Sequence, residues 1–284
     1  MQDFKYYAPT EVVFGKDAEE HLVEMINKYG GKKVLVHYGG HSAERSGLLA
    51  SVREKLNAAG IAFVELGGVK PNPRLTLVHE GIELCRKENV DFILAVGGGS
   101  VIDSSKAIGY GVKYDGDVWD IYARKYVPTE MLPVGVILTI PAAGSEMSDS
   151  SVITKEDGDL KIGYSNNICR PKFAIMNPVR TFTLPPYQTA CGATDIMMHT
   201  MERYFGKVDD MTLIDNIAEA LMRTVKDSVF HVLKNTEDYR NRACIMWASS
   251  LGHNDLTGDR SYADIATPQI EPELTALLDV PHGA

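Results

Sequence analysis

Apolar runs alternate with helical patterns from the start of the chain to about residue 180. Compact apolar runs occupy residues 34–38, 61–69, 92–96 and 134–140. Between them, apolar residues recur at helical spacing, as at Leu48, Leu49, Val52 and Leu56. Strands that alternate with helices in this way pair in parallel and are covered by the helices. The pattern therefore predicts an α/β fold with a mostly parallel, Rossmann-like sheet and helices on both faces.

The pattern changes at a double proline, Pro185-Pro186. After it, helical patterns rich in Ala, Met and Leu fill residues 188–205, 213–233 and 239–251, and β-rich runs are almost absent. Proline readily ends a strand and begins a helix, because it has no N–H to donate and its φ angle suits a first helical turn. We therefore expect an α/β domain over residues 1–183 and an all-helical domain over residues 184–284.

Composition and charge are those of an ordinary globular protein. Of the 284 residues, 44% are hydrophobic and 24% are charged. The net charge of −9 argues against a nucleic acid partner, because phosphate binding needs clustered Lys and Arg. No run of about 18 apolar residues occurs, and the N-terminus lacks the features of a signal peptide. We expect no membrane partner.

The cysteines favour a reducing compartment. Cys85, Cys169, Cys191 and Cys244 include no Cys-x-x-Cys pair. A disulfide framework or a structural zinc site of the cysteine type is therefore not expected. We predict four free thiols, buried or half-buried, in a cytoplasmic protein.

A glycine-rich turn follows the third apolar run. Gly97-Gly98-Gly99-Ser100 leads into a helical pattern, and Ser100 with Asp103 has the spacing of a capping box. Glycines let a ligand approach the backbone closely, and a helix N-terminus favours an anion such as a pyrophosphate. The alternative is a tight strand-to-helix turn that binds nothing. Neither the G-x-G-x-x-G fingerprint nor a Walker A loop is present.

A carboxylate and an imidazole share one face of the next predicted helix. Asp195 and His199 lie four residues apart, which suits two ligands of one divalent ion. An Asp–His pair at this spacing also occurs as an ordinary hydrogen-bonded surface pair. The spacing alone leaves both interpretations open.

Several strings, in this order and spacing, resemble the iron-containing (group III) alcohol dehydrogenases, most of all the NADP-preferring, butanol dehydrogenase-like branch. The resemblance runs from about Tyr7 to the last residue and rests on NPRL (72–75), EGI (80–82), AVGGGSVIDSSKAI (95–108), YDGDVWD (114–120) and TIPAAGSE (139–146). It implies a dehydroquinate synthase-like architecture. It also implies hydride transfer between a nicotinamide and a primary alcohol or aldehyde, with a metal that polarises the carbonyl.

The resemblance assigns residues to the cofactor. Gly98, Gly99 and Ser100 would hold the pyrophosphate, and Asp103 would lie near the nicotinamide. The remaining implied contacts are Thr139 and Ser145 at the adenine and ribose, and Lys161 at the nicotinamide ribose or a phosphate. Lys161 taken alone would be a solvated surface lysine.

The end of the second strand indicates which cofactor is used. An acid there would bind the adenosine ribose hydroxyls and repel a 2′-phosphate. This chain has Gly39, Gly40 and Ser42 instead, and NAD-selective relatives carry Asp at the position of Gly39. Backbone N–H groups and Ser42 could cradle a phosphate. We predict NADP(H), with NAD(H) as the alternative for a turn that tolerates both.

The same resemblance makes Asp195, His199 and His282 metal ligands, for Fe²⁺ or Zn²⁺. Pro268 occupies the position of a fourth family ligand, and Pro272 that of a histidine linked to proton transfer. Proline has no side-chain donor, so neither can serve. Three ligands can hold a catalytic metal, but more weakly than four. No catalytic residue other than the metal ligands is therefore assigned.

Family members continue in further helices beyond the His-Gly-Ala string that ends this chain. We therefore expect a C-terminally truncated helical domain and a homodimer that acts on a small alcohol or aldehyde. The alternative is a catalytically impaired nucleotide-binding remnant, because Pro268 and Pro272 replace family histidines and those helices are absent. A glycerol dehydrogenase or a dehydroquinate synthase-like enzyme of the same superfamily is a third interpretation.

Overall fold

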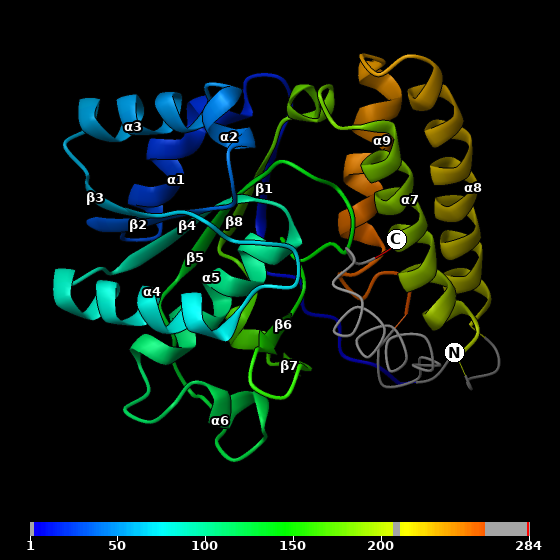
Figure 1. Ribbon diagram of the computed structural model, residues 1–284. Helices are drawn as coiled ribbons and strands as arrows, with labels where there is room; N and C mark the ends of the chain where they lie inside the picture. The colour runs from blue at the N-terminus through cyan, green and yellow to red at the C-terminus, as the bar shows by residue number, and fades with distance from the viewer. Residues whose placement is uncertain (1–2, 207–210, 259–282, 284) are drawn as a thin grey trace.

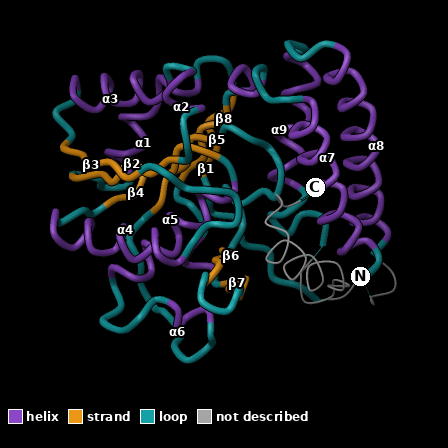
Figure 2. The backbone as a smooth tube through the Cα atoms, in the orientation of Figure 1, coloured by secondary structure: helices purple, strands orange, loops and turns teal. Residues whose placement is uncertain are grey.

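The computed structural model describes residues 3–206, 211–258 and 283. An α/β part built on a parallel sheet lies beside a group of three long helices, α7 to α9 (Figure 1). Figure 2 shows the same division, with the strands confined to the α/β part. The predicted fold class is confirmed: a parallel sheet with helices on both faces, followed by a helical C-terminal part.

Six strands form the main sheet in the order β1-β8-β5-β4-β2-β3, and every neighbouring pair is parallel. Their bounds are β1 Glu11–Phe14, β2 Lys33–Tyr38, β3 Ala62–Leu66, β4 Phe92–Gly97, β5 Val134–Leu138 and β8 Phe173–Met176. The apolar runs of the sequence correspond to β2, β3, β4 and β5. β4 and β5 are buried on both faces, as expected for central parallel strands.

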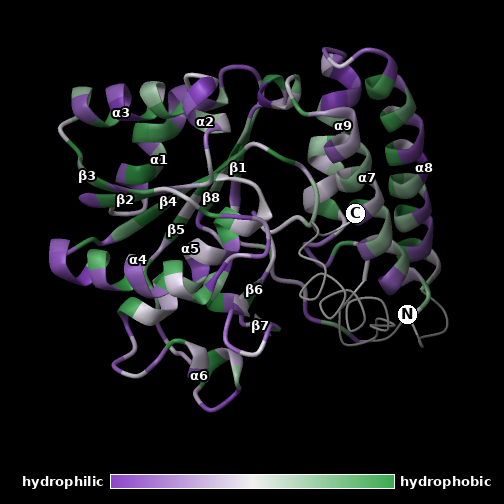
Figure 3. Ribbon diagram, in the orientation of Figure 1, coloured by the Kyte–Doolittle hydropathy of each residue, from purple (hydrophilic) through white to green (hydrophobic). Residues whose placement is uncertain are grey.

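The helices cover the sheet from two sides. Their bounds are α1 Leu22–Lys28, α2 Ser42–Arg45, α3 Leu48–Ala58, α4 Leu75–Glu88, α5 Gly99–Val112 and α6 Trp119–Tyr122. Helices α1 to α3 lie above the sheet and α4 and α5 below it (Figure 1). Alternate strand residues enter two separate apolar cores, with Val36 and Leu94 facing one and Leu35 and Ile93 the other. The central strands β4 and β5 are accordingly largely green in Figure 3, the colour of hydrophobic residues.

A small antiparallel hairpin lies outside the main sheet. It consists of β6 (Ser150–Lys155) and β7 (Leu160–Ser165). The sequence analysis did not predict these strands, nor β1 and β8, because β6 and β7 are partly polar and β1 and β8 are only four residues long. Short 3₁₀ segments are found at Ala18–His21, Asn167–Cys169 and Pro178–Thr181.

The helical part begins at the double proline. α7 spans Pro186–Tyr204, α8 spans Thr212–Lys234 and α9 spans Tyr239–Leu251. Pro185 is the N-cap of α7, and Pro186 stands in the first turn, where a missing N–H costs nothing. Ala193, Ile196, Val225 and Ile245 join the three helices in a third apolar core. Among the helices described, none is long and apolar enough to cross a membrane.

Candidate functional site

Two glycine turns, Gly39-Gly40 after β2 and Gly97-Gly98-Gly99 after β4, lie at the same edge of the sheet. From β2 the chain moves outward to β3 and then returns to form β4 on the other side of β2, so the strand order reverses between β2 and β4. Tyr38, at the end of β2, pairs with Val96, near the end of β4. Ligands of open α/β sheets bind at the carboxyl ends of strands at such a reversal.

The turn after β4 leaves room for a ligand against the backbone. A Cβ on Gly97 would lie 2.5 Å from Val101 Cγ2, so only glycine allows the strand to enter α5 this closely. A Cβ on Gly99 would meet nothing within 4 Å, so the space above this residue is open. Of the first-turn N–H groups of α5, that of Val101 donates to Gly98 O at 3.0 Å, whereas those of Gly99 and Ser100 precede the first helical hydrogen bond. An anionic group such as a pyrophosphate therefore fits here.

The predicted capping box at this turn is wrong. Gly98 is the N-cap of α5, which begins at Gly99, and no side chain caps it. Asp103 Oδ1 instead accepts a hydrogen bond of 2.6 Å from Ser145 Oγ, and Asp103 Oδ2 accepts one of 2.9 Å from Val152 N. The Asp103 carboxylate thus ties α5 to the segment after β5 and to β6. Ser145 is buried at this junction.

The other cofactor candidates lie on different elements. Thr139 follows β5 directly, and its N–H donates to Gly97 O at 3.0 Å, so it borders the glycine turn. Lys161 stands on β7, opposite Thr154 and partly exposed. Gly39 and Gly40 follow β2, and Ser42 begins the short helix α2. The fold thus gathers Gly39, Gly98 and Thr139 at one edge, and Lys161 belongs to the hairpin.

The predicted metal pair lies near the middle of α7. The Asp195 side chain is 1% exposed and the residue His199 is 8% exposed. His199 Nε2 lies 3.4 Å from Asp195 Oδ1, and His199 Nδ1 lies 3.2 Å from Glu202 Oε2. Glu202 was not assigned from the sequence, although its spacing places it on the same helical face.

The donor chemistry of this pair fits a divalent ion. Two ligands about 2.1 Å from one tetrahedral ion are roughly 3.4 Å apart, which is the separation seen between His199 Nε2 and Asp195 Oδ1. A ligating histidine usually donates its other N–H to a carboxylate or carbonyl, as His199 does to Glu202. In residues 3–206, 211–258 and 283, no three His, Cys, Asp or Glu side chains form a complete metal-holding group.

The remaining predicted ligand lies outside the described residues, and so do Pro268 and Pro272. Gly283 follows His282 in sequence and is described. Its φ angle is +77°, and a Cβ on it would lie 2.6 Å from Cys191 O and 3.0 Å from Asp195 Cβ. The Gly283 backbone therefore packs against α7 beside Asp195.

Models of two protein families match the chain. "Iron-containing alcohol dehydrogenase" matches residues 9–178, and "Fe-containing alcohol dehydrogenase family, C-terminal" matches residues 189–284. The chain belongs to the iron-containing alcohol dehydrogenase family. It is thus by family an NAD(P)-dependent alcohol dehydrogenase, an oxidoreductase.

Named relatives of this iron-containing alcohol dehydrogenase use both nicotinamide cofactors. This chain is 44% identical to the probable NADH-dependent butanol dehydrogenase 1 of Bacillus subtilis, over 100% of this chain and 73% of the relative. It is 37% identical to the NADPH-dependent aldehyde reductase YqhD of Escherichia coli, over 100% and 73%. The crystal structure of NADH-dependent butanol dehydrogenase A from Thermotoga maritima superimposes with a TM-score of 0.97 at 39% identity, covering 100% of this chain and 71% of the other.

Two histidines of the dehydrogenase that no sequence motif marks are buried in the structure. His37 Nδ1 donates to Leu66 O at 2.7 Å, so Nε2 of the neutral ring accepts from Ser104 Oγ at 2.8 Å. Burial lowers the pKa of His37 to about 4, so its ring is neutral and structural. His253 packs against His199, with 4.5 Å between the ring centroids. Sequence spacing could not reveal this contact, because the fold alone brings α7 and the end of α9 together.

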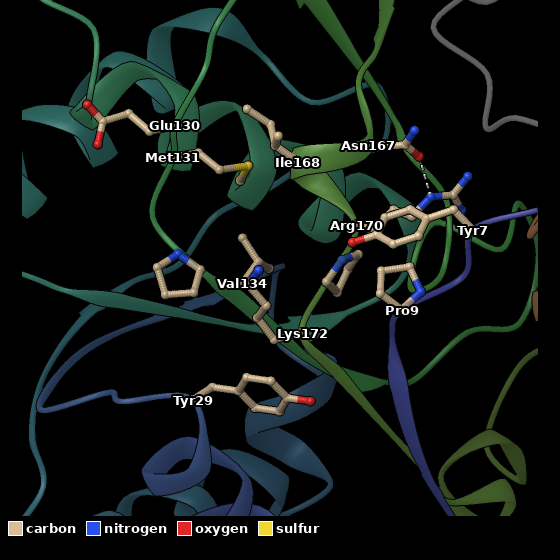
Figure 4. A pocket seen from close by; sticks show the side chains of 12 residues that line it. Tyr7, Pro9, Tyr29, Glu130, Met131, Val134, Asn167, Ile168, Arg170 and Lys172 are labelled. Atoms are coloured by element: carbon tan, nitrogen blue, oxygen red, sulfur yellow. Dashed lines mark hydrogen bonds between the residues drawn. The ribbon is translucent and has the colours of Figure 1, made fainter.

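A cavity of about 620 Å³ lies away from the candidate site of the dehydrogenase. Val134 and Lys172 line it, and they stand at the amino ends of β5 and β8. Figure 4 shows Tyr7, Tyr29 and Arg170 around the same space. In a parallel sheet this edge is opposite to the carboxyl ends, so the cavity takes no part in the site described above.

The cysteines are free thiols, as predicted, with Cys85 and Cys169 buried.

Proposed function

We propose that the chain is a metal-dependent, NADP(H)-linked alcohol dehydrogenase or aldehyde reductase acting on a small primary alcohol or aldehyde such as butanol or butanal. The observation that carries the proposal is the close packing of α7 against the loop after β5. A Cβ on Gly192 would clash with Pro141 O, so only a glycine lets the helix with Asp195 and His199 approach the glycine-turn edge. Hydride transfer requires the two halves of the site to be this close.

Residues of the chain have separable tasks in this reaction. When bound, the metal would supply a Lewis acid for the substrate oxygen and the nicotinamide would carry the hydride. Asp195 and His199 would hold the ion, with His282 as the third ligand. Glu202 accepts a hydrogen bond from the Nδ1–H group of His199 and thereby directs Nε2 toward Asp195. The N–H groups of Gly99 and Ser100 would bind the pyrophosphate.

The preference for NADP(H) rests on the end of β2. No acid follows Tyr38, and the acid on the next strand, Glu65, is paired with Arg53 at 3.0 Å. A 2′-phosphate would therefore meet glycines and Ser42 instead of a carboxylate. Some relatives are named NADH-dependent and others NADPH-dependent, so this preference is a proposal for this chain.

Gly39→Asp should reverse the cofactor preference. Gly39 has an ordinary φ angle, and a Cβ there would lie 3.5 Å from Val69 O, so a side chain fits. The added carboxylate should lower kcat/KM for NADPH about 10–100-fold, since juxtaposed like charges cost several kcal/mol. Steady-state kinetics with both cofactors measure this. Gly39→Asn is the matched neutral control and should leave NADPH use nearly unchanged. Equal losses in both variants would contradict the charge argument.

The wider proposal is a cytoplasmic homodimer. The free cysteines favour a reducing compartment. The net charge of −9 is compatible with a small neutral substrate and gives no attraction to nucleic acid. Size-exclusion chromatography with light scattering tests the dimer.

The direct test is NADPH consumption with butanal by the purified chain supplied with Fe²⁺ without oxygen. The Pro268→His, Pro272→His double variant is measured beside it. Turnover by the unaltered chain is the expected result, and it would exclude the impaired-remnant alternative. Activity in the double variant alone would locate the defect at the two proline positions. Silence of both proteins would overturn the proposed activity and favour the remnant.

A further inference from the structure

His253 follows α9 and occupies a position that the proposed mechanism does not use. It is 8% exposed, and its ring lies 4.5 Å from the His199 ring, centroid to centroid, at an angle of 41°. Its Nδ1 lies 2.5 Å from Ala143 O, in the loop after β5. A carbonyl only accepts hydrogen bonds, so Nδ1 carries the proton. His253 therefore connects this loop to the predicted metal ligand on α7.

The loop is shaped to receive His253. Gly144 has a φ of +66°, which only glycine adopts readily, and a Cβ there would lie 2.8 Å from His253 Cβ. The same Cβ would clash with Ser249 O at the end of α9. The next residue, Ser145, is fixed to Asp103 on α5. A continuous set of contacts thus runs from the helix of the glycine turn, through the loop, to His253 and His199.

His253 adds a contact from outside the helix to the His199 ring. The two ring nitrogens of His199 face Asp195 and Glu202, both on α7, and these two contacts hold the ring relative to its own helix. His253 touches the imidazole of His199 and is anchored to Ala143, so it also relates the ring to the loop after β5.

We propose that His253 is a positioning residue that fixes the His199 ring against the loop after β5 and so sets the metal relative to the cofactor edge. The inference rests on the proposed metal site at Asp195 and His199. A residue that orients a ligand contributes to metal affinity, and loss of such a partner costs about 10–100-fold. The effect should appear in metal binding itself, before any turnover.

The test compares two replacements that each keep one half of the contact. His253→Asn retains an N–H that can donate to Ala143 but loses the ring, whereas His253→Phe retains the ring but loses the donor. Co²⁺ is titrated into metal-free protein, and affinity and the visible Co²⁺ spectrum are recorded. His253→Asn should bind about 10–100-fold more weakly with an altered spectrum, and His253→Phe should recover part of the affinity. His79→Asn, a partly exposed histidine paired with Asp117, should match the unaltered protein.

Other outcomes would overturn the inference in distinct ways. If His253→Asn binds Co²⁺ as tightly as the unaltered protein with the same spectrum, His253 does not position His199. An equal loss of NADPH affinity, measured by fluorescence, would mean that His253 supports the loop in general and not the ligand. Asp195→Asn is the reference. If Asp195→Asn also binds Co²⁺ normally, the proposed metal site fails, which is a different failure from that of His253 alone.

Discussion

Asp195→Asn should lower kcat/KM about 1,000-fold or more, because a bound metal contributes several kcal/mol to charge stabilisation in the transition state. The asparagine has nearly the same shape but no charge, and the Asp195 side chain is almost completely buried, so water cannot replace the carboxylate as a ligand. Metal content by mass spectrometry and kinetics with butanal measure the two losses together. Asp227→Asn, an exposed carboxylate on α8, is the control and should retain both.

Metal content and kinetics also decide whether Asp195 is a ligand. A variant that keeps its metal and its activity within about threefold would remove Asp195 from the ligand set.

Four strands of the main sheet and the long helices could be predicted because their signals are local. β2, β3, β4 and β5 coincide with apolar runs of the sequence, and α9 coincides with the predicted helical pattern over residues 239–251. β8 has only four residues, and its partners β1 and β5 are distant in sequence, so no local pattern marks it. Tertiary pairing decides such short strands.

The sequence could suggest those parts of the candidate site that lie on a single turn or helix. It could not suggest contacts that the fold makes between two separate elements. Gly98, Gly99, Asp195 and His199 each belong to a single turn or helix. The spacing of Ser100 and Asp103 predicts a capping box, but a hydroxyl from another segment, that of Ser145, donates to the Asp103 carboxylate instead. Such competition between local and tertiary hydrogen bonds is invisible in a spacing pattern.

Lys106 is the clearest case of a residue whose role only the fold reveals. It lies in the string AVGGGSVIDSSKAI (95–108), where the sequence suggests only an ordinary polar residue of the helix. In the structure it is 0% exposed. Its Nζ lies 2.7–3.1 Å from three carbonyl oxygens, those of Ser145, Ser148 and Ser150, and also approaches the hydroxyls of Ser145 and Ser148. One ammonium group thus holds residues 145–150, where the segment after β5 enters β6.

Glu146 extends this buried polar group to the helical part. Its carboxylate accepts hydrogen bonds from Ser250 Oγ at 2.5 Å and Ser249 Oγ at 3.3 Å, both on α9. Burial raises the pKa of Glu146 above its ordinary value, and the serine hydroxyls and the Lys106 charge partly oppose that rise. An acid with a raised pKa in the folded state stabilises the fold below its ordinary pKa, and this contribution is lost as pH rises through the folded value.

Lys106→Met should cost about 3–5 kcal/mol of unfolding free energy, because methionine has a similar length but leaves several buried carbonyls without a donor. This loss of unfolding free energy should be larger at neutral pH than near pH 4.5, which is the ordinary pKa of Glu146. The reason is that losing the Lys106 charge raises the pKa of Glu146 in the folded protein further. Urea unfolding at the two pH values measures both effects. Lys125→Met removes a lysine that is 68% exposed and should change stability by less than about 0.5 kcal/mol. A loss below about 1 kcal/mol in Lys106→Met would show that the segment between β5 and β6 holds its shape without the ammonium group.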